Sequence, residues 1–302
     1  MKQRRKSMFN FCGAWPALVT PFTAEDKVNV RVLQELVEYL LDKGVGGFYV
    51  CGGTGEGLFM VPEERKLVTE TVVGQVNGRA PVIAHVGSMI VGDAVQLAEH
   101  AQEVGAAGIS SVIPPMFQNS ESLYTYFERV GAAAPDIPLL TYIFGGPTDA
   151  VALMGRLMDI PTVAGAKYTG PNMYEFREIV ELRGDNWSIF SGMDEQCIYA
   201  AMQGACGNIG STLNYNPGIY REIHNSHGNG NIAKAQELQV YANQITRVLF
   251  SFGFFGALKE VMHMLGFDCG KPRLPQLPFP VEKREQLKAE LDAIDFFTVA
   301  EM

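Results

Sequence analysis

A lysine ends one short apolar segment of the sequence, where Lys167 follows Val163-Ala164-Gly165-Ala166. Lysine is rarely buried without a partner, because desolvation disfavours its charged form. The same effect lowers the pKa of the amine and makes it nucleophilic, so such a lysine can form a Schiff base with a carbonyl compound. The alternative is a lysine at a strand end that reaches solvent, and both interpretations stay open on this run alone.

A glycine-rich turn, Cys51-Gly52-Gly53-Thr54-Gly55-Glu56-Gly57, follows another apolar run. Its backbone N–H groups can converge on an anion because few side chains stand in the way, so a carboxylate or a phosphate would fit. No Gly-Lys-Ser/Thr follows, which excludes a P-loop, and the dinucleotide fingerprint G-x-G-x-x-G is absent. The glycine spacing by itself favours a plain tight turn.

Three more apolar runs lead to polar residues. Tyr142 ends Leu139-Leu140-Thr141, and a phenol near a desolvated lysine could act as an acid or base; the alternative is a core tyrosine with a satisfied hydroxyl. The other two runs end in Gly192-Met193-Asp194-Glu195 and Gly210-Ser211-Thr212-Leu213-Asn214, where a polyhydroxylated substrate could be held. The two acids could instead simply begin a helix, since acids are favoured there.

The histidines and cysteines show no pattern typical of a metal or disulfide site. The five histidines lack a spacing such as i, i+4 on one helix with a carboxylate, so we expect no metal and no cofactor. The five cysteines are an odd number, widely spread and without a C-x-x-C pair, which indicates reduced thiols in the cytoplasm.

The composition bounds the class of protein. The chain has 302 residues, 47% of them hydrophobic, which is enough for a sizeable core and excludes disorder. Its formal charge of −9 makes nucleic acid an unfavourable partner, because an acidic protein gains nothing from counterion release. No apolar stretch approaches the roughly 20 residues of a membrane span. Basic residues near the start are followed by Phe9-Asn10-Phe11-Cys12-Gly13 rather than by an apolar signal region, so we expect no export.

These candidate residues need elements that position them, and the sequence predicts eight βα units. Short β-rich runs recur every 25 to 35 residues or so, and each is followed by a segment of helical periodicity. The runs are nearly all apolar, as parallel strands covered by helices require. The predicted strands are Ala14–Thr20, Gly47–Cys51, Pro81–Val86, Gly108–Ile113, Pro138–Phe144, Thr162–Tyr168, Trp187–Ser191 and Gly207–Thr212.

Eight units in about 215 residues is the size of a closed (β/α)₈ barrel, whereas an open doubly wound sheet more often has five or six strands. In such a barrel the active site lies at the carboxyl ends of the strands, which is where the candidate residues stand. Three further helices, roughly Ile232–Leu249, Gly256–Met264 and Glu282–Asp292, predict a C-terminal appendage. We therefore expect a barrel over 1–225 and a helical appendage over 226–302.

Taken together, these residues resemble the family of N-acetylneuraminate lyases and dihydrodipicolinate synthases, which are Schiff-base aldolases. The resemblance extends over nearly the whole chain, and the order and spacing of its motifs in eight βα units make it specific. It rests on Trp15-Pro16-Ala17-Leu18-Val19-Thr20-Pro21-Phe22, Gly52-Gly53-Thr54-Gly55-Glu56, Tyr142, Gly165-Ala166-Lys167 and Gly210-Ser211-Thr212.

The resemblance implies a (β/α)₈ barrel, usually in a homotetramer, that acts on a small 2-oxo acid. Lys167 would form an iminium with that acid, Tyr142 would shuttle protons, and Thr54 with neighbouring N–H groups, including that of Gly53, would bind the carboxylate. The sequence is most similar to the lyase branch, which cleaves N-acetylneuraminate to pyruvate and N-acetylmannosamine. Positions of that branch that hold the sugar are matched by Thr169, Gly192, Asp194, Glu195 and Ser211, and Gly210 is a further expected substrate-binding residue.

The synthase branch is disfavoured by two positions. The segment after Tyr142, Ile143-Phe144-Gly145-Gly146-Pro147, offers no arginine for a second carboxylate, and Phe117 stands where the synthases have a relay tyrosine.

Other features depart from the lyases. Family members usually carry Ser or Thr at the position of Gly53, the usual proline shortly after Tyr142 is missing, and the loop that follows is shorter. Glycine at that position is associated with the branch that dehydrates 5-dehydro-4-deoxyglucarate. The alternatives are therefore a related 2-oxo sugar-acid aldolase or dehydratase, and a non-catalytic homologue that binds 2-oxo acids.

Overall fold

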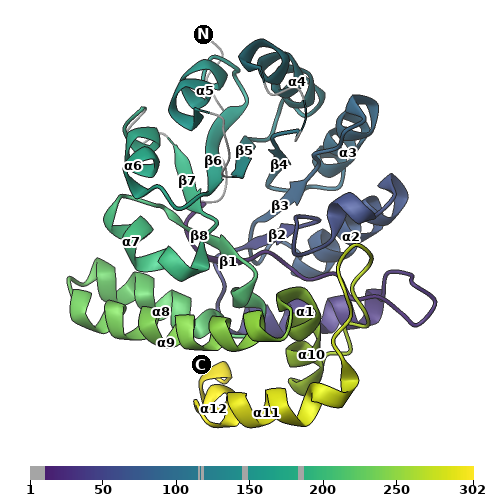
Figure 1. Cartoon of the computed structure of the whole chain (residues 1–302). Coiled ribbons are helices and arrows are strands. Elements are labelled where there is room, and N and C mark those ends of the chain that lie inside the picture. Colours follow the sequence, from purple (N-terminus) through teal and green to yellow (C-terminus); the bar gives the residue numbers. More distant parts are fainter. Residues whose placement is uncertain (1–10, 115, 117–118, 145–148, 183–186) are drawn as a thin grey trace.

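Eight parallel strands form the centre of the structure, a computed structural model that describes residues 11–114, 116, 119–144, 149–182 and 187–302 (Figure 1). Their order is β1-β8-β7-β6-β5-β4-β3-β2. The ring closes where Ala17 bridges Tyr49 and the Leu18 N–H donates to the Tyr49 carbonyl at 2.9 Å. The predicted barrel is confirmed. Its strands are β1 Gly13–Pro16, β2 Phe48–Val50, β3 Val82–His85, β4 Gly108–Val112, β5 Leu139–Phe144, β6 Val163–Thr169, β7 Ser188–Ser191 and β8 Gly207–Gly210.

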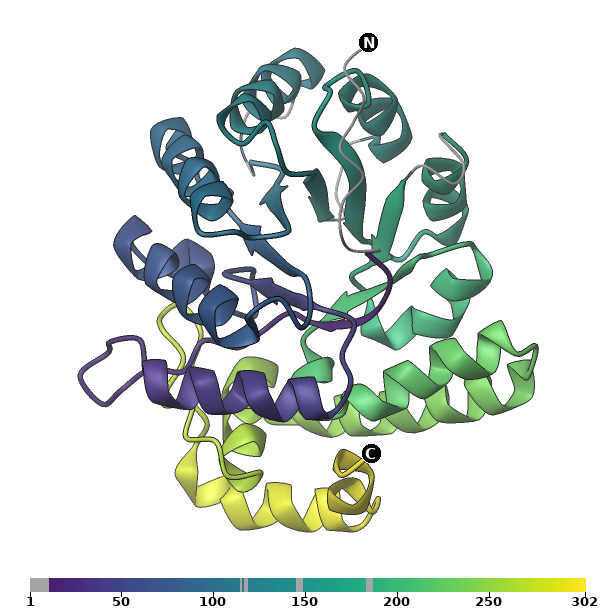
Figure 2. The ribbon, with the colours of Figure 1, turned by 180° about the vertical axis from the view of Figure 1, so that it is seen from behind.

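Helices surround the barrel, one after each strand, as both views show (Figures 1 and 2). The first begins at Asn29, whose side chain accepts the Val32 N–H, and ends before Gly44, whose φ of +70° suits glycine. The second begins at Pro62, where a missing N–H costs nothing. These helices are α1 Val30–Asp42, α2 Pro62–Val76, α3 Val91–Glu103, α4 Ser120–Ala133, α5 Ala150–Leu157, α6 Met173–Glu181, α7 Cys197–Met202 and α8 Pro217–Gly228.

Large side chains fill the inside of the barrel, so it is a packed core and not a pore. The strands also pack outward against the helices, and burial on both faces explains why their sequences show no polar alternation. The buried cluster inside comprises Phe11, Trp15, Ala17, Tyr49, Ile83, Leu140, Phe190 and Ile209.

The C-terminal helices lie beneath the barrel along α8 and α1 (Figure 2). The three predicted helices are present as α9 Ile232–Ser251, α10 Phe254–Met264 and α11 Arg284–Asp292. A fourth, α12 Phe296–Ala300, was not predicted, because five residues are too few to show a helical period. The expected boundary after residue 225 falls within α8, and the division into two domains stays a prediction.

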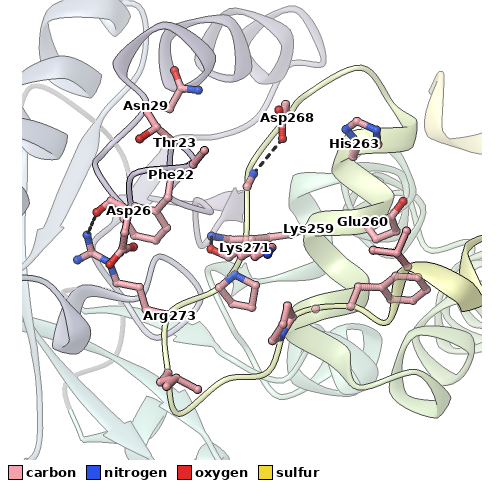
Figure 3. A pocket seen from close by; sticks show the side chains of 18 of the residues that line it. Phe22, Thr23, Asp26, Asn29, Lys259, Glu260, His263, Asp268, Lys271 and Arg273 are labelled. Atoms are coloured by element: carbon pink, nitrogen blue, oxygen red, sulfur yellow. Dashed lines mark hydrogen bonds and ion pairs between the residues drawn. The ribbon is translucent and has the colours of Figure 1, made fainter.

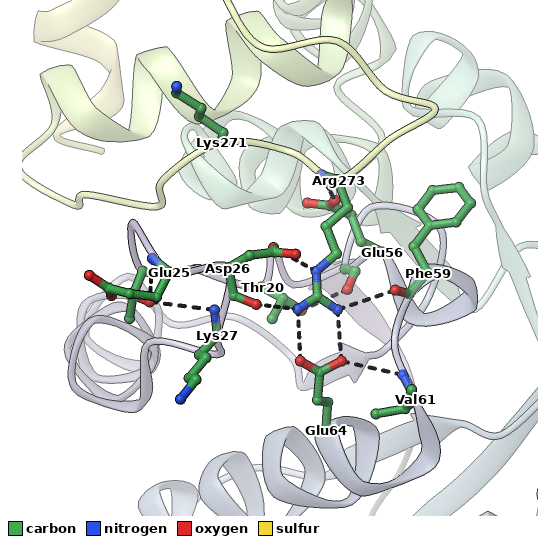
Figure 4. A network of polar contacts seen from close by, with 12 residues as sticks. Thr20, Glu25, Asp26, Lys27, Glu56, Phe59, Val61, Glu64, Lys271 and Arg273 are labelled. Atoms are coloured by element: carbon green, nitrogen blue, oxygen red, sulfur yellow. Dashed lines mark hydrogen bonds and ion pairs between the residues drawn. The ribbon is translucent and has the colours of Figure 1, made fainter.

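An arginine fastens the segment after α10 to the barrel (Figure 4). Arg273 forms two charge-assisted hydrogen bonds with the Glu64 carboxylate, both 2.7 Å, and its Nε lies 2.8 Å from Asp26. Its backbone N–H donates to Glu56 Oε2 at 2.6 Å. Glu56 belongs to the glycine-rich turn after β2, so the C-terminal segment directly holds that turn.

A cavity of about 940 Å³ lies beside this attachment, between the segment that precedes α1, helix α10 and the 268–281 segment (Figure 3). Its buried and half-buried cations already have carboxylate partners: Lys259 pairs with Glu56, and Arg273 pairs with Asp26 and Glu64. None of the residues with predicted chemistry lines the cavity. Its position therefore does not mark the site of reaction.

Among the described residues, no helix combines the length and apolar character that would be needed to cross a membrane.

Candidate active site

The predicted site residues come together at the carboxyl ends of five barrel strands, those of β2, β5, β6, β7 and β8. The centre is formed by two neighbouring strands, because the register of β5 and β6 places Tyr142 directly beside Lys167. The Lys167 Nζ lies 4.5 Å from the centre of the Tyr142 ring and 4.8 Å from that of the Tyr49 ring. Only 5% of the Lys167 surface is exposed. Its ammonium group thus stays inside the barrel and does not reach solvent.

Burial changes the acidity of this lysine. Desolvation lowers the pKa of Lys167 to about 8, and the Asp194 carboxylate opposes the shift. Roughly a tenth of the amine is therefore uncharged at pH 7, far more than for an ordinary lysine, and the uncharged amine is the form that attacks a carbonyl carbon. The same desolvation raises the pKa of Tyr142 to about 12, with the nearby Thr169 hydroxyl opposing it. The phenol therefore holds its proton until a reacting group takes it.

Two glycines make room for the polar groups around Lys167. A Cβ on Gly192 would lie 1.8 Å from the Thr169 hydroxyl and 2.9 Å from Lys167 Cε. A Cβ on Gly210 would lie 1.6 Å from an oxygen of Asp194. Both positions therefore require glycine for steric reasons. The Thr169 hydroxyl is buried close to Tyr142, whose pKa it lowers, and has no other hydrogen-bond partner among the described residues.

The glycine-rich turn meets the end of β8 at the same mouth of the barrel. The Thr54 and Ser211 hydroxyl oxygens lie 2.6 Å apart, and Thr54 is buried. Gly53 is exposed, and a Cβ added to it would meet nothing within 4 Å. A side chain at position 53 would therefore point into open space at the barrel mouth.

Asp194 is held by protein donors. Its carboxylate accepts hydrogen bonds from the Asn208 side chain at 3.1 Å and from the Thr212 N–H and hydroxyl at 3.0 and 2.7 Å. The residue is 5% exposed, and burial raises its pKa. Glu195 is only partly buried, and burial together with the Asp194 charge raises its pKa as well. Asp194 is thus fixed beside Lys167, whereas Glu195 keeps an accessible carboxylate.

Sequence reasoning missed two aromatic residues next to Lys167. Tyr49 is fully buried in β2, and its ring is perpendicular to that of Tyr142 at 6.4 Å. His85, at the end of β3, lies 6.2 Å from both rings and accepts the Val112 N–H through Nε2 at 3.0 Å. The available signal was the alternation of strand side chains, which sends Tyr49 into the barrel if Phe48 and Val50 face the helices.

Phe117 and the 145–147 segment, which bear on the synthase alternative, lie outside the described residues. Within the described chain no group of three or more His, Cys, Asp or Glu side chains is arranged to hold a metal ion.

Comparison with known proteins identifies the family. The model of the dihydrodipicolinate synthetase family matches residues 10–294. The chain belongs to this family. Its curated relatives include the N-acetylneuraminate lyase of Danio rerio, 34% identical with 96% of this chain and 98% of the relative covered. They also include the 4-hydroxy-tetrahydrodipicolinate synthase of Caldicellulosiruptor saccharolyticus, 35% identical with 93% and 96% covered.

Among solved structures of the family, the N-acetylneuraminate lyase of Proteus mirabilis superposes with a TM-score of 0.90 at 31% identity, over 94% of this chain and 99% of that one. The chain is accordingly an enzyme of the lysine Schiff-base lyase class found in this dihydrodipicolinate synthetase family. Lyases and synthases are about equally similar in sequence, so identity alone leaves the substrate open.

Proposed function

We propose that the protein cleaves N-acetylneuraminate to pyruvate and N-acetylmannosamine, with Lys167 as the Schiff-base residue. The observation that carries the proposal is the position of Lys167: buried at the barrel mouth, with a lowered pKa and with the Tyr142 phenol on the adjacent strand. The names of the lyase relatives support the substrate.

In the proposed reaction the Lys167 amine attacks the C2 ketone of the substrate, and the Tyr142 phenol gives its proton to the departing water, which leaves an iminium and a phenolate. The Tyr142 phenolate then takes the proton of the C4 hydroxyl while the C3–C4 bond breaks. The bonding electrons move to the iminium and leave an enamine, and N-acetylmannosamine departs as the aldehyde. The phenol then returns a proton to C3, and hydrolysis releases pyruvate and restores the lysine.

The surrounding residues suit the two ends of such a substrate. We propose that Thr54, Ser211 and the N–H groups of the turn around Gly53 bind the carboxylate. The Thr169 hydroxyl and the Glu195 carboxylate would bind sugar hydroxyls, while Gly192 and Gly210 leave the room that the Thr169 and Asp194 side chains occupy. Asp194, already bound by three protein donors, would contribute mainly its charge and the position of this segment.

The test is to incubate the protein with pyruvate and borohydride, which reduces an iminium to a stable secondary amine, and to locate the added mass by peptide analysis. We expect the adduct on Lys167 in the wild type and none in Lys167→Met. Lys271→Met, which removes an exposed lysine, serves as the matched control and should label fully. An adduct on another lysine, or none in folded protein, would contradict the assignment.

A second candidate keeps the Schiff base and changes the substrate to another 2-oxo sugar acid. The open space at Gly53 favours it, because position 53 offers a carboxylate only a backbone N–H and no hydroxyl of its own. A panel that includes N-acetylneuraminate and 5-dehydro-4-deoxyglucarate, assayed for pyruvate and for dehydration, separates the two. Saturable binding of 2-oxo acids with no product from any of them would indicate a non-catalytic homologue.

We also propose that the enzyme works in the cytoplasm as a homotetramer. The reduced cysteines support this compartment, since all five are free in the structure. Fractionation of cells tests the compartment, and the mass of the protein in solution tests the assembly.

A further inference from the structure

The Lys167 nitrogen lies against the faces of two aromatic rings, and the reaction proposed above gives a role to only one of them. The Tyr142 ring carries the phenol of the proton relay. The Tyr49 ring, with its centre 4.8 Å from Nζ, is within the roughly 6 Å over which a ring face attracts a cation. The two rings are perpendicular, so they line two sides of the nitrogen.

The surroundings of Tyr49 hold its ring in this orientation. The ring is fully buried, and its hydroxyl donates to Ser110 Oγ on β4, or accepts from it, at 3.0 Å. A Cβ on Gly52 would lie 2.6 Å from the ring, which shows how closely the backbone packs on it. The hydroxyl is bonded to Ser110, and the face of the Tyr49 ring is the part that lies against the Lys167 nitrogen.

The third ring of this cluster adds no charge. His85 accepts the Val112 N–H through Nε2, so a proton on that atom would break the contact. Burial and the nearby cations Arg65 and Lys167 lower the pKa of His85 well below its usual value. His85 therefore stays neutral and packs against both tyrosines. Arg65 donates to the His85 and Gly87 carbonyls at 2.6 and 2.9 Å, which fixes the end of β3.

Among the described residues, few charged or titratable groups face the nitrogen. They are Asp194 from the segment after β7, Tyr49 from β2, His85 from β3 and Tyr142 from β5, with Arg65 of α2 behind His85. Asp194 is the carboxylate among them, and three protein donors already bind it. Ring faces thus form a large part of the environment of a cation at this position.

We propose that Tyr49 is a further catalytic residue, whose ring face stabilises the positive charge that the Lys167 nitrogen carries in the iminium. The inference rests on the proposed Schiff base at Lys167.

The effect of the Tyr49 ring on the iminium equilibrium depends on pH. Well above pH 8 the free lysine is neutral, so the ring stabilises the iminium and not the free enzyme. Near pH 6 the free lysine is an ammonium, so the ring stabilises both forms and its effect on the equilibrium cancels.

The experiment measures the equilibrium fraction of iminium with pyruvate, by borohydride trapping and mass spectrometry, at pH 6 and at pH 9.5. We compare the wild type with Tyr49→Leu, which removes the face, and with Tyr49→Phe, which keeps the face and removes the bond to Ser110. Phe127→Leu, a fully buried aromatic on α4 outside the barrel, controls for loss of packing. Circular dichroism confirms folding of each variant.

We expect Tyr49→Leu to weaken iminium formation about threefold to thirtyfold at pH 9.5 and by less than about twofold at pH 6. Tyr49→Phe should retain most of the wild-type fraction at both pH values, and Phe127→Leu should match the wild type. An equal loss at both pH values, or an equal loss in the leucine and phenylalanine variants, would overturn the role of the ring face. A wild type that gives no adduct at Lys167 would instead contradict the proposed function itself.

Discussion

Glycines at the barrel mouth differ in whether they can accept a side chain, and this difference makes a residue-level prediction. We expect Gly192→Ala to reduce kcat/KM at least tenfold, because the new Cβ collides with Thr169 and with Lys167 Cε. In Gly53→Ala the new Cβ faces open space, so this variant serves as the matched control. Its unfolding temperature should be unchanged, and its kcat/KM should fall less than that of Gly192→Ala. Steady-state kinetics and thermal unfolding measure both. Equal losses in the two variants would argue against the steric explanation.

The buried lysine also predicts how stability depends on pH. In the folded protein Lys167 loses its proton near pH 8, whereas in the unfolded chain it does so near about 10.4. Between these values the unfolded state binds more protons, so the free energy of unfolding rises with pH over this window and is lower below it. Lys167→Met should remove this dependence and gain on the order of 3 kcal/mol at pH 7.

Urea denaturation of the wild type and Lys167→Met at several pH values from 6 to 10 measures this difference. The range stops at pH 10 because Tyr142, with its raised pKa, acts in the opposite direction above it. A constant difference between the two proteins across the range would contradict the lowered pKa.

At the scale of elements, the C-terminal appendage is coupled to the glycine-rich turn by a buried ion pair. Lys259 of α10 lies 2.7 Å from Glu56, and the two side chains are only 4% and 1% exposed. Lys259→Met leaves the Glu56 charge without its partner, so we expect a loss of about 3–5 kcal/mol in the free energy of unfolding. A higher KM should accompany it, since Thr54 lies in the same turn.

Two variants check that explanation. Lys259→Met with Glu56→Gln removes both charges and should recover part of the stability. Lys288→Ala breaks an ion pair whose side chains are about half exposed, so it should cost at most about 1 kcal/mol and leave KM unchanged. If Lys259→Met has no larger effect than Lys288→Ala, the coupling is not significant.

The sequence could predict the strands and most helices because their signals are local. The run from Val163 to Ala166 lacks polar residues, and Asn29 and Pro62 mark where helices begin. It could not show that Glu56 meets Lys259, because that contact joins residues some 200 positions apart and nothing in either local pattern refers to the other. Likewise, the ends of two predicted strands pointed to Lys167 and Tyr142, and the resemblance gave their roles. That the Tyr49 ring lies beside them follows only from the closure of the barrel.

At the scale of the whole molecule, some of the exposed apolar side chains lie in two places on the outside of the barrel that an assembly could cover. One group precedes α2 and α3, which are adjacent in Figure 1, and the other lies on α6 and α7. Exposed patches of this kind typically mark contact surfaces between proteins. The first group is Leu58, Val61, Met89 and Ile90, and the second is Tyr174, Tyr199 and Met202.

A homotetramer with two kinds of two-fold contact needs two such self-complementary faces. We therefore expect a mass of about 132 kDa in solution, four times the 33.1 kDa chain, measured by light scattering after size exclusion. Ile90→Lys and Tyr199→Lys should each disrupt one face and leave dimers of half that mass, because a lysine in a buried apolar contact must be desolvated. Val240→Lys, at an equally exposed apolar position on α9, should remain tetrameric. A monomeric wild type, or dissociation by Val240→Lys alone, would mean that these apolar groups are not the contacts between copies of the chain.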